Sequence, residues 1–199
     1  MSYTFVFDLD GTITREEALP ALARCLGNGE EMQQRTATAM QMETPFAPDF
    51  LQRVALLQAL PLAQARQVIC SLARFEEIVS FIGQHKKSCL IVTGNLDVYI
   101  QDFLQEIGMD TRCISSVGMA QNGKLLAVRK VIDKAEVVRN LPRPLVCIGD
   151  GSNDVGMIAT ADIGIAFGGA HPVSPQLQQV ADYYFTDEHA LCDFLQTLC

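Results

Sequence analysis

The segment Tyr3–Thr12, YTFVFDLDGT, decides the fold of this chain. Its apolar run, Tyr3–Leu9, indicates a short buried strand, which leads directly into an acidic turn containing Asp8, Asp10 and Gly11. In α/β proteins, ligand-binding side chains gather in such turns, at the carboxyl ends of the strands. The segment therefore predicts the first strand of a sheet whose functional residues follow at once.

From about residue 75 to the end, apolar runs of strand length alternate with helical patterns. This alternation predicts an α/β fold with a doubly wound parallel sheet and helices on both of its faces. Strands are expected at Ser88–Val92, Leu145–Ile148, Ile163–Phe167 and Tyr183–Phe185, a hairpin at Met119–Val128 around the turn Asn122-Gly123, and helices at Glu76–Gln84, Leu96–Ile107 and Asp133–Asn140.

The stretch between residues 15 and 74 has no strand pattern. Helices are expected near Ala18–Leu26, Glu30–Glu43, Asp49–Leu60 and Leu62–Ala73, with a break at TPFAP (residues 44–48), because proline disfavours helix continuation. We therefore expect residues 1–14 and 75–199 to form the sheet core and residues 15–74 to form an all-helical insertion. An insertion directly after the first strand lies above the carboxyl ends of the strands and is suited to act as a lid.

The polar clusters that follow the expected strands contain four aspartates. Asp8 and Asp10 follow the first strand, Asp150 and Asp154 belong to the segment GDGSND, and a third cluster, TGN (residues 93–95), follows a strand between them. Because strand ends of a doubly wound sheet meet at one edge, we expect these carboxylates in one cavity. Two carboxylates about 4 Å apart repel by roughly 4 kcal/mol at an effective dielectric constant near 20, so the cavity needs a cation or shared protons. Oxygen ligands without histidine or cysteine favour Mg²⁺.

The composition excludes some classes of partner. The chain has 199 residues, of which 49% are hydrophobic and 19% charged, and its net charge is −8. Nucleic acids and anionic membranes attract proteins with a surplus of Lys and Arg, so we expect neither as a partner. Neither a membrane-spanning run nor a signal peptide is expected. Seven cysteines, an odd number without C-x-x-C spacing, indicate reduced thiols and a cytoplasmic location. The sequence carries no signal for the oligomeric state.

The order of these motifs resembles that of the haloacid dehalogenase superfamily. DLDGT, the strand and loop IVTGN, a downstream lysine and GDGSND match its four motifs, and the helical insertion resembles the cap of its phosphoserine phosphatase branch. The resemblance implies a Rossmann-like, doubly wound parallel sheet core with an inserted all-helical (C1-type) cap. It also implies Mg²⁺-dependent hydrolysis of a small phosphorylated metabolite through an aspartyl phosphate.

The resemblance implies catalytic roles for Asp8, Asp10, Thr93 and a lysine, and a substrate-binding role for Gly94. Asp8 would attack phosphorus and carry the phosphoryl group. Asp10 would protonate the leaving oxygen and then activate water. The hydroxyl of Thr93 and the backbone amide of Gly94 would hold phosphate oxygens.

The resemblance also implies a set of metal ligands. Asp8 and Asp150 would bind Mg²⁺ through their side chains and Asp10 through its backbone carbonyl. Asp154 would either contact these ligands without binding the ion or bind it through a bridging water. Asn153 would help to hold the phosphate or to order the loop.

The third motif requires one lysine that neutralises the phosphate and steadies Asp8. Lys130 and Lys134 compete for this role. Lys134 opens the helical segment KAEVV and matches the family pattern better, because a helix N-terminus also favours a nearby anion.

The insertion carries a candidate substrate site. Glu17 lies nine positions after Asp8, where phosphoserine phosphatases carry a glutamate for the substrate amine, and Arg53, in FLQRVALLQALP, matches their arginine for the substrate carboxylate. Such a pair suits a zwitterion, which makes phosphoserine the expected substrate. The alternative is that both are solvated helix residues. Asn95 departs from the family, whose phosphoserine phosphatases usually carry Ser-Gly-Gly at the second motif.

Other functions are compatible with the same motifs. The enzyme could hydrolyse another small ester, such as a sugar phosphate or a sulfur-salvage intermediate, or transfer the phosphoryl group to an alcohol. A receiver-like signalling domain also uses aspartate and Mg²⁺, but such domains have no aspartate at the position of Asp10 and no helical cap. His85, His171 and His189 belong to no cluster with ligand spacing, so surface positions or local hydrogen bonds are expected for them.

Overall fold

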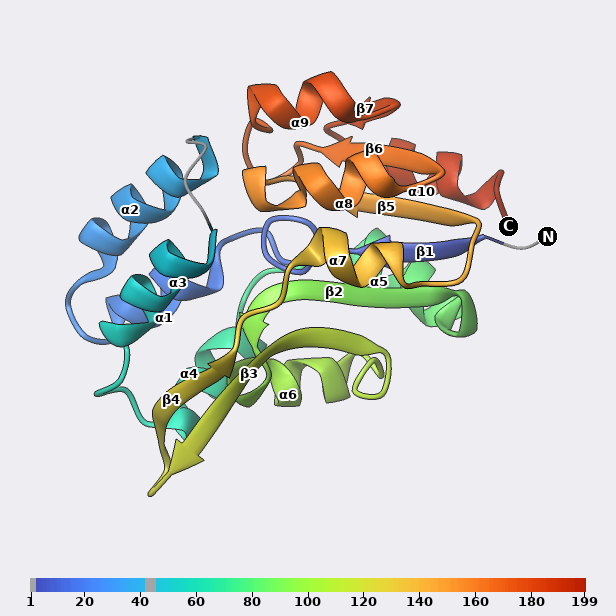
Figure 1. The fold of residues 1–199 in the computed structure, drawn as a ribbon. Helices are drawn as coiled ribbons and strands as arrows, with labels where there is room; N and C mark the ends of the chain where they lie inside the picture. The colour runs from blue at the N-terminus through green and yellow to red at the C-terminus, as the bar shows by residue number, and fades with distance from the viewer. Residues whose placement is uncertain (1–2, 42–45) are drawn as a thin grey trace.

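The structure is a computed structural model that describes residues 3–41 and 46–199. Within these residues a seven-stranded sheet has the order β4-β3-β2-β1-β5-β6-β7, in which β3 and β4 pair antiparallel and the other neighbours pair parallel (Figure 1). The strands are β1 (Thr4–Phe7), β2 (Cys89–Leu96), β3 (Cys113–Gln121), β4 (Lys124–Lys130), β5 (Leu145–Gly149), β6 (Ile163–Phe167) and β7 (Tyr183–Phe185). The expected α/β fold is confirmed.

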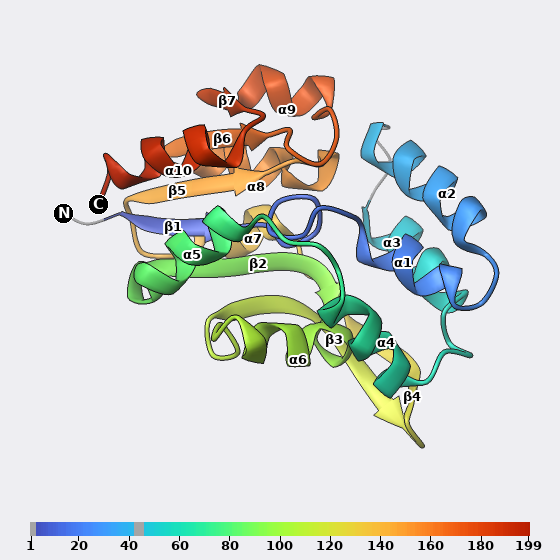
Figure 2. The same cartoon turned by 180° about the vertical axis from the view of Figure 1, so that it is seen from behind.

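β1 lies in the middle of the sheet because its side chains are apolar on both faces. Phe5 and Phe7 pack into one apolar cluster and Val6 into the other, as in parallel sheets that are covered on both sides. Helices α5 (Glu76–Gln84), α6 (Asp97–Glu106) and α10 (Glu188–Gln196) cover one face, and α7 (Lys134–Arg139), α8 (Val155–Thr160) and α9 (Pro175–Val180) cover the other (Figures 1 and 2). Among the described residues, none of the helices combines the length and the apolar character needed to cross a bilayer.

The strand order reverses at β1, which positions the site. β1 pairs with β2 on one side and with β5 on the other, so the segments that follow these three strands meet at one edge. In open α/β sheets, ligands bind at such a point.

The described part of the chain between β1 and α5 is helical. It contains α1 (Ala18–Arg24), α2 (Gly29–Gln41), α3 (Phe46–Ala55) and α4 (Leu62–Cys70). The chain enters and leaves this segment side by side, because Thr14 and Arg74 form an antiparallel bridge. Helices α1, α2 and α3 lie beyond the carboxyl end of β1, and α4 packs against α6 of the sheet region (Figures 1 and 2).

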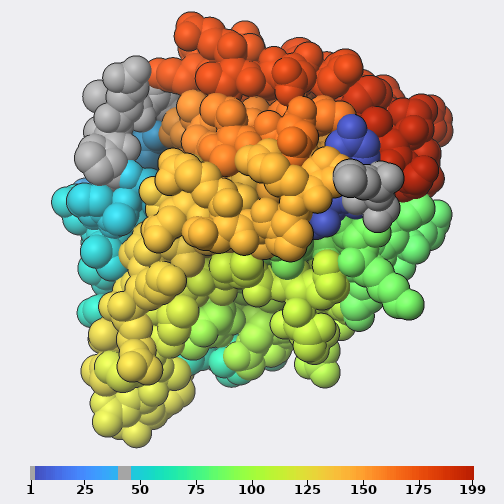
Figure 3. Space-filling view, turned by 45° about the vertical axis from the view of Figure 1, so that its right-hand side comes forward, coloured from blue at the N-terminus to red at the C-terminus, as the bar shows by residue number. Residues whose placement is uncertain are grey.

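The hairpin of β3 and β4 reaches the inserted helices. Its tight turn uses Asn122 and Gly123 with positive φ angles of 52° and 72°, as expected from their sequence. The backbone N–H of Leu62 donates to Gly123 O (2.8 Å), and Pro61 forms a bridge with Lys124. In the space-filling view the yellow hairpin projects from the molecule beside the cyan part of the insertion (Figure 3).

Two expected boundaries are wrong for identifiable reasons. β2 continues through Thr93 to Leu96 instead of ending before the TGN cluster, because a bulge in its pairing with β3 absorbs the extra residues. α3 begins at Phe46, three residues before the expected start, because Pro48 lies in its first turn, where no backbone N–H is needed. The expected end of the preceding helix at Glu43 lies outside the described residues.

The sequence analysis also missed the first half of β3 and the short helix α9. β3 is nine residues long and pairs in parallel with β2, whereas α9 has six residues and begins with a Ser174 cap followed by proline.

Candidate active site

The polar clusters expected from the sequence meet at the carboxyl edge of the sheet. A cavity lies between these strand ends and the helices α1, α2 and α3. Eight of the candidate residues line it: Asp8, Asp10, Glu17, Arg53, Thr93, Gly94, Asp150 and Asn153. The two remaining candidates, Lys134 and Asp154, are buried and connect to the cavity through Asp8.

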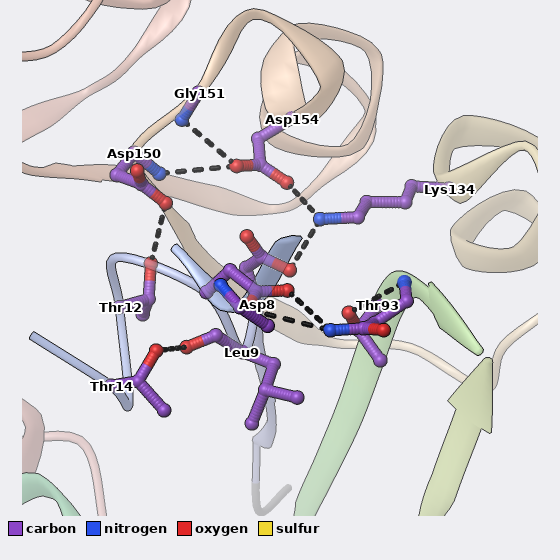
Figure 4. Close-up of polar contacts among 12 residues, drawn as sticks. Asp8, Leu9, Thr12, Thr14, Thr93, Lys134, Asp150, Gly151 and Asp154 are labelled. Atoms are coloured by element: carbon purple, nitrogen blue, oxygen red, sulfur yellow. Dashed lines mark hydrogen bonds and ion pairs between the residues drawn. The ribbon is translucent and has the colours of Figure 1, made fainter. Parts of the chain in front are cut away.

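Lys134 lies between two aspartates (Figure 4). Its Nζ donates to Asp8 Oδ1 and, at 2.6 Å, to Asp154 Oδ1, and all three side chains are buried. Burial lowers the pKa of Lys134, but the two carboxylates outweigh burial and raise it, so the amine is a cation. Because the ammonium group compensates two buried carboxylates, its removal would leave charge unpaired in the interior.

The start of α7 delivers this lysine. Asp133 caps the helix by accepting hydrogen bonds from the backbone N–H groups of Ala135 and Glu136. Lys134 follows as the first helical residue, whereas Lys130 is exposed at the end of β4. The structure therefore brings Lys134, and not Lys130, to Asp8.

The backbone fixes Asp154. Its Oδ2 accepts hydrogen bonds from the N–H groups of Asp150 (3.1 Å) and Gly151 (3.0 Å), while its Oδ1 accepts from Lys134 (Figure 4). Since both carboxylate oxygens are occupied, Asp154 orients the loop and the lysine.

Asp8, Asp150 and Asp154 form an acidic cluster that suits a cation. One ligand atom of each lies within 4.8 Å of the others. Burial, followed by Asp154, raises the pKa of Asp8 well above its usual range, although Lys134 lowers it. Asp150 Oδ1 accepts from the Thr12 hydroxyl (3.0 Å), whereas its Oδ2 is buried without a hydrogen bond of good geometry. A cluster of three buried carboxylates fits a hard ion such as Mg²⁺.

Asp10 is held from two sides. Its Oδ1 accepts from the backbone N–H of Ala18 (3.0 Å), at the start of α1, and its Oδ2 accepts from Asn95 Nδ2 (3.1 Å). Burial, followed by Glu17, raises the pKa of Asp10 to about 7, although both hydrogen bonds lower it. A carboxyl group with this pKa can donate and accept a proton near neutral pH.

Thr93 and Gly94 present polar atoms to the cavity. Thr93 Oγ1 accepts from the backbone N–H of Asn95 (3.1 Å), which leaves the hydroxyl hydrogen free to donate. Gly94 lies under the ring of Phe46, where an added Cβ would approach the ring to 2.5 Å. The absence of a side chain at Gly94 therefore keeps its backbone accessible and lets the ring cover it.

Arg53 is buried on the insertion side of the cavity, with only 5% of its surface exposed. Its Nε donates to Asp49 (2.7 Å) on the same helix and its Nη1 to the Thr36 hydroxyl (3.2 Å) on α2. Both Arg53 and Glu17 line the cavity, so neither is a solvated helix residue. Thr36 is a contact that the sequence analysis did not single out.

His171 is a further residue that the sequence analysis missed, because only a surface position or local hydrogen bonds were expected for it; it has the local contact with Pro172 but also reaches Asp150. Its Nε2 lies 2.8 Å from Asp150 Oδ2 and 3.8 Å from Glu17 Oε1. Asp150, followed by Glu17, raises the pKa of His171 to about 10. The approach depends on Gly11, where an added Cβ would lie 2.3 Å from Asp150 Oδ2. A single histidine far from the motifs in sequence gave no signal of this contact.

Comparisons with known proteins agree with this geometry. A model of the haloacid dehalogenase-like hydrolases matches residues 5–159. The chain belongs to this family. The phosphoserine phosphatase of Archaeoglobus fulgidus is 29% identical over 199 aligned positions, covering 92% of this chain and 56% of that protein. The phosphoserine phosphatase of Methanocaldococcus jannaschii is 27% identical over 192 positions, covering 89% of each. The chain thus spans just over half of the first relative and most of the second.

A solved structure extends the likeness to the fold. A phosphoserine phosphatase with an analogue of the phospho-aspartyl intermediate superposes with a TM-score of 0.82 at 23% identity, covering 97% of this chain and 98% of that one. The resemblance to the phosphoserine phosphatase branch of this hydrolase family is therefore confirmed.

Proposed function

We propose that this protein is a Mg²⁺-dependent phosphomonoesterase that hydrolyses phosphoserine through an aspartyl phosphate on Asp8. The observation that carries the proposal is the meeting of Asp8, Asp10 and Lys134 at the strand ends, facing a buried arginine on the insertion. Family membership and the phosphoserine phosphatase relatives support the same reaction class.

In the proposed first step, a carboxylate oxygen of Asp8 attacks phosphorus. The bond from phosphorus to the substrate oxygen breaks, and Asp10 gives its proton to that oxygen, so the product is a neutral alcohol. Lys134 balances the negative charge of the phosphoryl group, and Thr93 and Gly94 donate to its oxygens.

In the proposed second step, water attacks the phosphorus atom of the aspartyl phosphate. Asp10, now a carboxylate, takes the proton from water, and the bond between Asp8 and phosphorus breaks to give free phosphate. The raised pKa of Asp10, about 7, suits a group that alternates between the two states.

The acidic cluster fits Mg²⁺, which when bound would balance the carboxylates and the phosphate charge. Asp8 and Asp150 would hold it through side-chain oxygens and Asp10 through its backbone carbonyl, while Asp154 would orient this set from behind. His171 Nε2 lies 2.8 Å from Asp150 Oδ2 and would help to fix the orientation of this carboxylate.

The insertion would select the substrate and close the site. We assign residues 15–74 to the helical cap and residues 1–14 and 75–199 to the core. Arg53 would pair with the substrate carboxylate and Glu17 with its amine. Asn153 would contact the phosphate from the core side, since it lines the same cavity.

A small phosphorylated metabolite fits this cavity, and nucleic acid and membrane surfaces are not expected as partners of an acidic chain. All seven cysteines lie within the described residues and are free, which supports the proposed cytoplasmic location.

The test is phosphate release from three matched esters, with Mg²⁺ or EDTA. L-Phosphoserine carries both substituents, O-phosphoethanolamine lacks the carboxylate, and 3-phosphoglycerate has a hydroxyl in place of the amine. We expect phosphoserine to lead each of the others by at least tenfold in kcat/KM, which corresponds to about 1.4 kcal/mol in transition-state binding. Asp8→Asn should abolish turnover of all three, because the acceptor of the phosphoryl group is lost.

The outcomes separate the parts of the proposal. Metal-dependent release that survives in Asp8→Asn contradicts the assignment of the nucleophile. Equal rates with all three esters contradict the roles of Glu17 and Arg53 while leaving the core chemistry intact. No Mg²⁺-dependent release from any phosphate ester contradicts the phosphatase assignment itself.

A further inference from the structure

The side chain of Asn95 contacts the proposed acid and base, Asp10, from the sheet side. Its Nδ2 lies 3.1 Å from Asp10 Oδ2 and 3.5 Å from Oδ1, and 3% of its surface is exposed. A buried carboxylate is sensitive to the loss of a hydrogen-bond donor.

The orientation of the Asn95 amide follows from its other contact. Its Oδ1 accepts a hydrogen bond from the backbone N–H of Leu96 at 2.8 Å. If the amide were turned over, its NH₂ group would face that N–H and its oxygen would face the carboxylate of Asp10. The contact with the Leu96 N–H would then be repulsive whatever the charge of Asp10, so the NH₂ group faces Asp10.

A second donor completes the arrangement. The backbone N–H of Ala18 donates to Asp10 Oδ1 (3.0 Å) from the opposite side of the carboxyl group. Because each oxygen accepts from a different fixed donor, the plane of the carboxyl group cannot rotate without losing one of them. Each oxygen keeps a second lone pair, which can carry the transferred proton. One donor belongs to the insertion and the other to the bulge of β2.

We propose that Asn95 is a positioning residue that holds the carboxyl group of Asp10 in the plane from which it protonates the leaving oxygen. This inference rests on the proposed function. Asn95 acts through Asp10, so its contribution is confined to the steps in which Asp10 transfers a proton. The loss of a correctly placed acid lowers rates by about 10²- to 10⁴-fold, and a misplaced acid retains part of that effect.

This role has a signature that a structural role lacks. In the first step the phosphorus–oxygen bond of phosphoserine breaks, and the serine oxygen must take the proton of Asp10 to leave as an alcohol. The leaving group of p-nitrophenyl phosphate departs as a phenolate, whose charge the nitro group stabilises, and it needs no proton. The value of kcat/KM reports on the steps from free enzyme and substrate up to the first irreversible step. Here that step is the cleavage that releases the alcohol and leaves the aspartyl phosphate.

The experiment compares kcat/KM for the two esters in Asn95→Ala, Asn95→Leu and Asn95→Ser. Leucine keeps the volume of the side chain without a donor, and serine offers a shorter donor. We expect Asn95→Ala and Asn95→Leu to lose about 10- to 100-fold with phosphoserine and less than about threefold with p-nitrophenyl phosphate. Asn95→Ser should recover part of the loss.

Asp97→Ala provides a matched control at the same junction. Asp97 Oδ1 accepts hydrogen bonds from the backbone N–H groups of Val98 (2.8 Å) and Gly118 (2.7 Å), at the start of α6, and has no contact with Asp10 among the described side chains. This variant should lower the melting temperature and change both esters by the same factor. Melting curves of the Asn95 variants show whether they are folded.

Two results overturn the inference. Equal losses with both esters in the Asn95 variants, as in the control, would assign Asn95 a purely structural role. Unchanged phosphoserine hydrolysis would show that Ala18 alone positions Asp10. If the wild-type protein cleaves neither ester nor any alkyl phosphate, the proposed function is contradicted. This outcome is distinguishable from the two results above because it is seen in the wild-type protein, before any substitution.

Discussion

The sheet edge and the inserted helices hold their polar residues by different means. At the sheet edge, backbone N–H groups help to position two carboxylates: those of Asp150 and Gly151 bind Asp154, and that of Ala18, at the start of the insertion, binds Asp10. On the insertion, side chains position the guanidinium group of Arg53.

This difference indicates which part of the site tolerates amino-acid substitution. A backbone donor persists whatever side chain its residue carries, so the positions of Asp154 and Asp10 depend partly on the fold alone. A contact between two side chains disappears with one substitution, so the selectivity of the insertion can change while the chemistry stays. The four predictions below test this contrast, from the largest expected effect to the smallest.

The first prediction concerns the cation at the sheet edge. Lys134→Met should lower kcat by about 10²- to 10³-fold with every ester, because the charge that faces the phosphoryl group is lost. Steady-state kinetics with phosphoserine and p-nitrophenyl phosphate measure this effect. The matched control is Lys130→Met, which removes an exposed lysine at the end of β4 and should leave both rates unchanged. A large loss in the control and none in Lys134→Met would reverse the choice between these lysines.

The second prediction concerns the insertion. Arg53→Ala should raise KM for phosphoserine by about 10- to 100-fold, because a charge-assisted pair contributes about 1.5–3 kcal/mol, and should change kcat little. O-Phosphoethanolamine, which has no carboxylate, should be hydrolysed as before. Arg35→Ala is the control, since Arg35 forms an exposed pair with Glu31 on α2. An equal rise in KM for both esters would show that Arg53 supports the structure of the insertion and does not bind the substrate carboxylate.

The third prediction concerns pH and the metal. Burial raises the pKa of Asp150 to about 6, above its ordinary value of 3.8. In metal-free protein, proton binding to Asp150 therefore stabilises the folded state at low pH, and this contribution is lost as the pH rises through about 6. Mg²⁺ needs the ionised form, so its apparent affinity should be about tenfold or more weaker at pH 5 than at pH 8.

Melting temperatures with Mg²⁺ and with EDTA at the two pH values measure this dependence. The increase caused by Mg²⁺ should be larger at pH 8, and Asp150→Asn should remove it at both. An increase of the same size at pH 5 and pH 8 would be inconsistent with Asp150 as a ligand that must lose a proton.

The fourth prediction sharpens the contrast at a single hydroxyl group. Thr36→Val keeps the shape of the side chain but removes the oxygen that accepts from Arg53. KM for phosphoserine should rise about fivefold, in line with a hydrogen bond contribution of about 1 kcal/mol. Thr38→Val is the control, because within residues 3–41 and 46–199 the exposed Thr38 hydroxyl bonds only to a carbonyl of its own helix. No change in KM would mean that Asp49 alone orients the guanidinium group.

The sequence by itself determined the sheet, the helical segment that interrupts it and the positions at which the carboxylates follow the strands. Asp8, Asp10 and Asp150 could be placed together because parallel strands end at one edge whatever the details of their packing. Lys134 could be preferred over Lys130 because the start of a helix has its own sequence pattern.

Only the tertiary structure decided the contacts between side chains from different elements. Asn95 reaches Asp10 because the bulge of β2 turns it toward β1, and His171 reaches Asp150 through a loop with no motif of its own. Thr36 meets Arg53 because two helices pack face to face. Such contacts depend on how helices and strands pack in three dimensions. The sequence pattern predicts only the spacing of apolar residues within each element and where the element begins and ends.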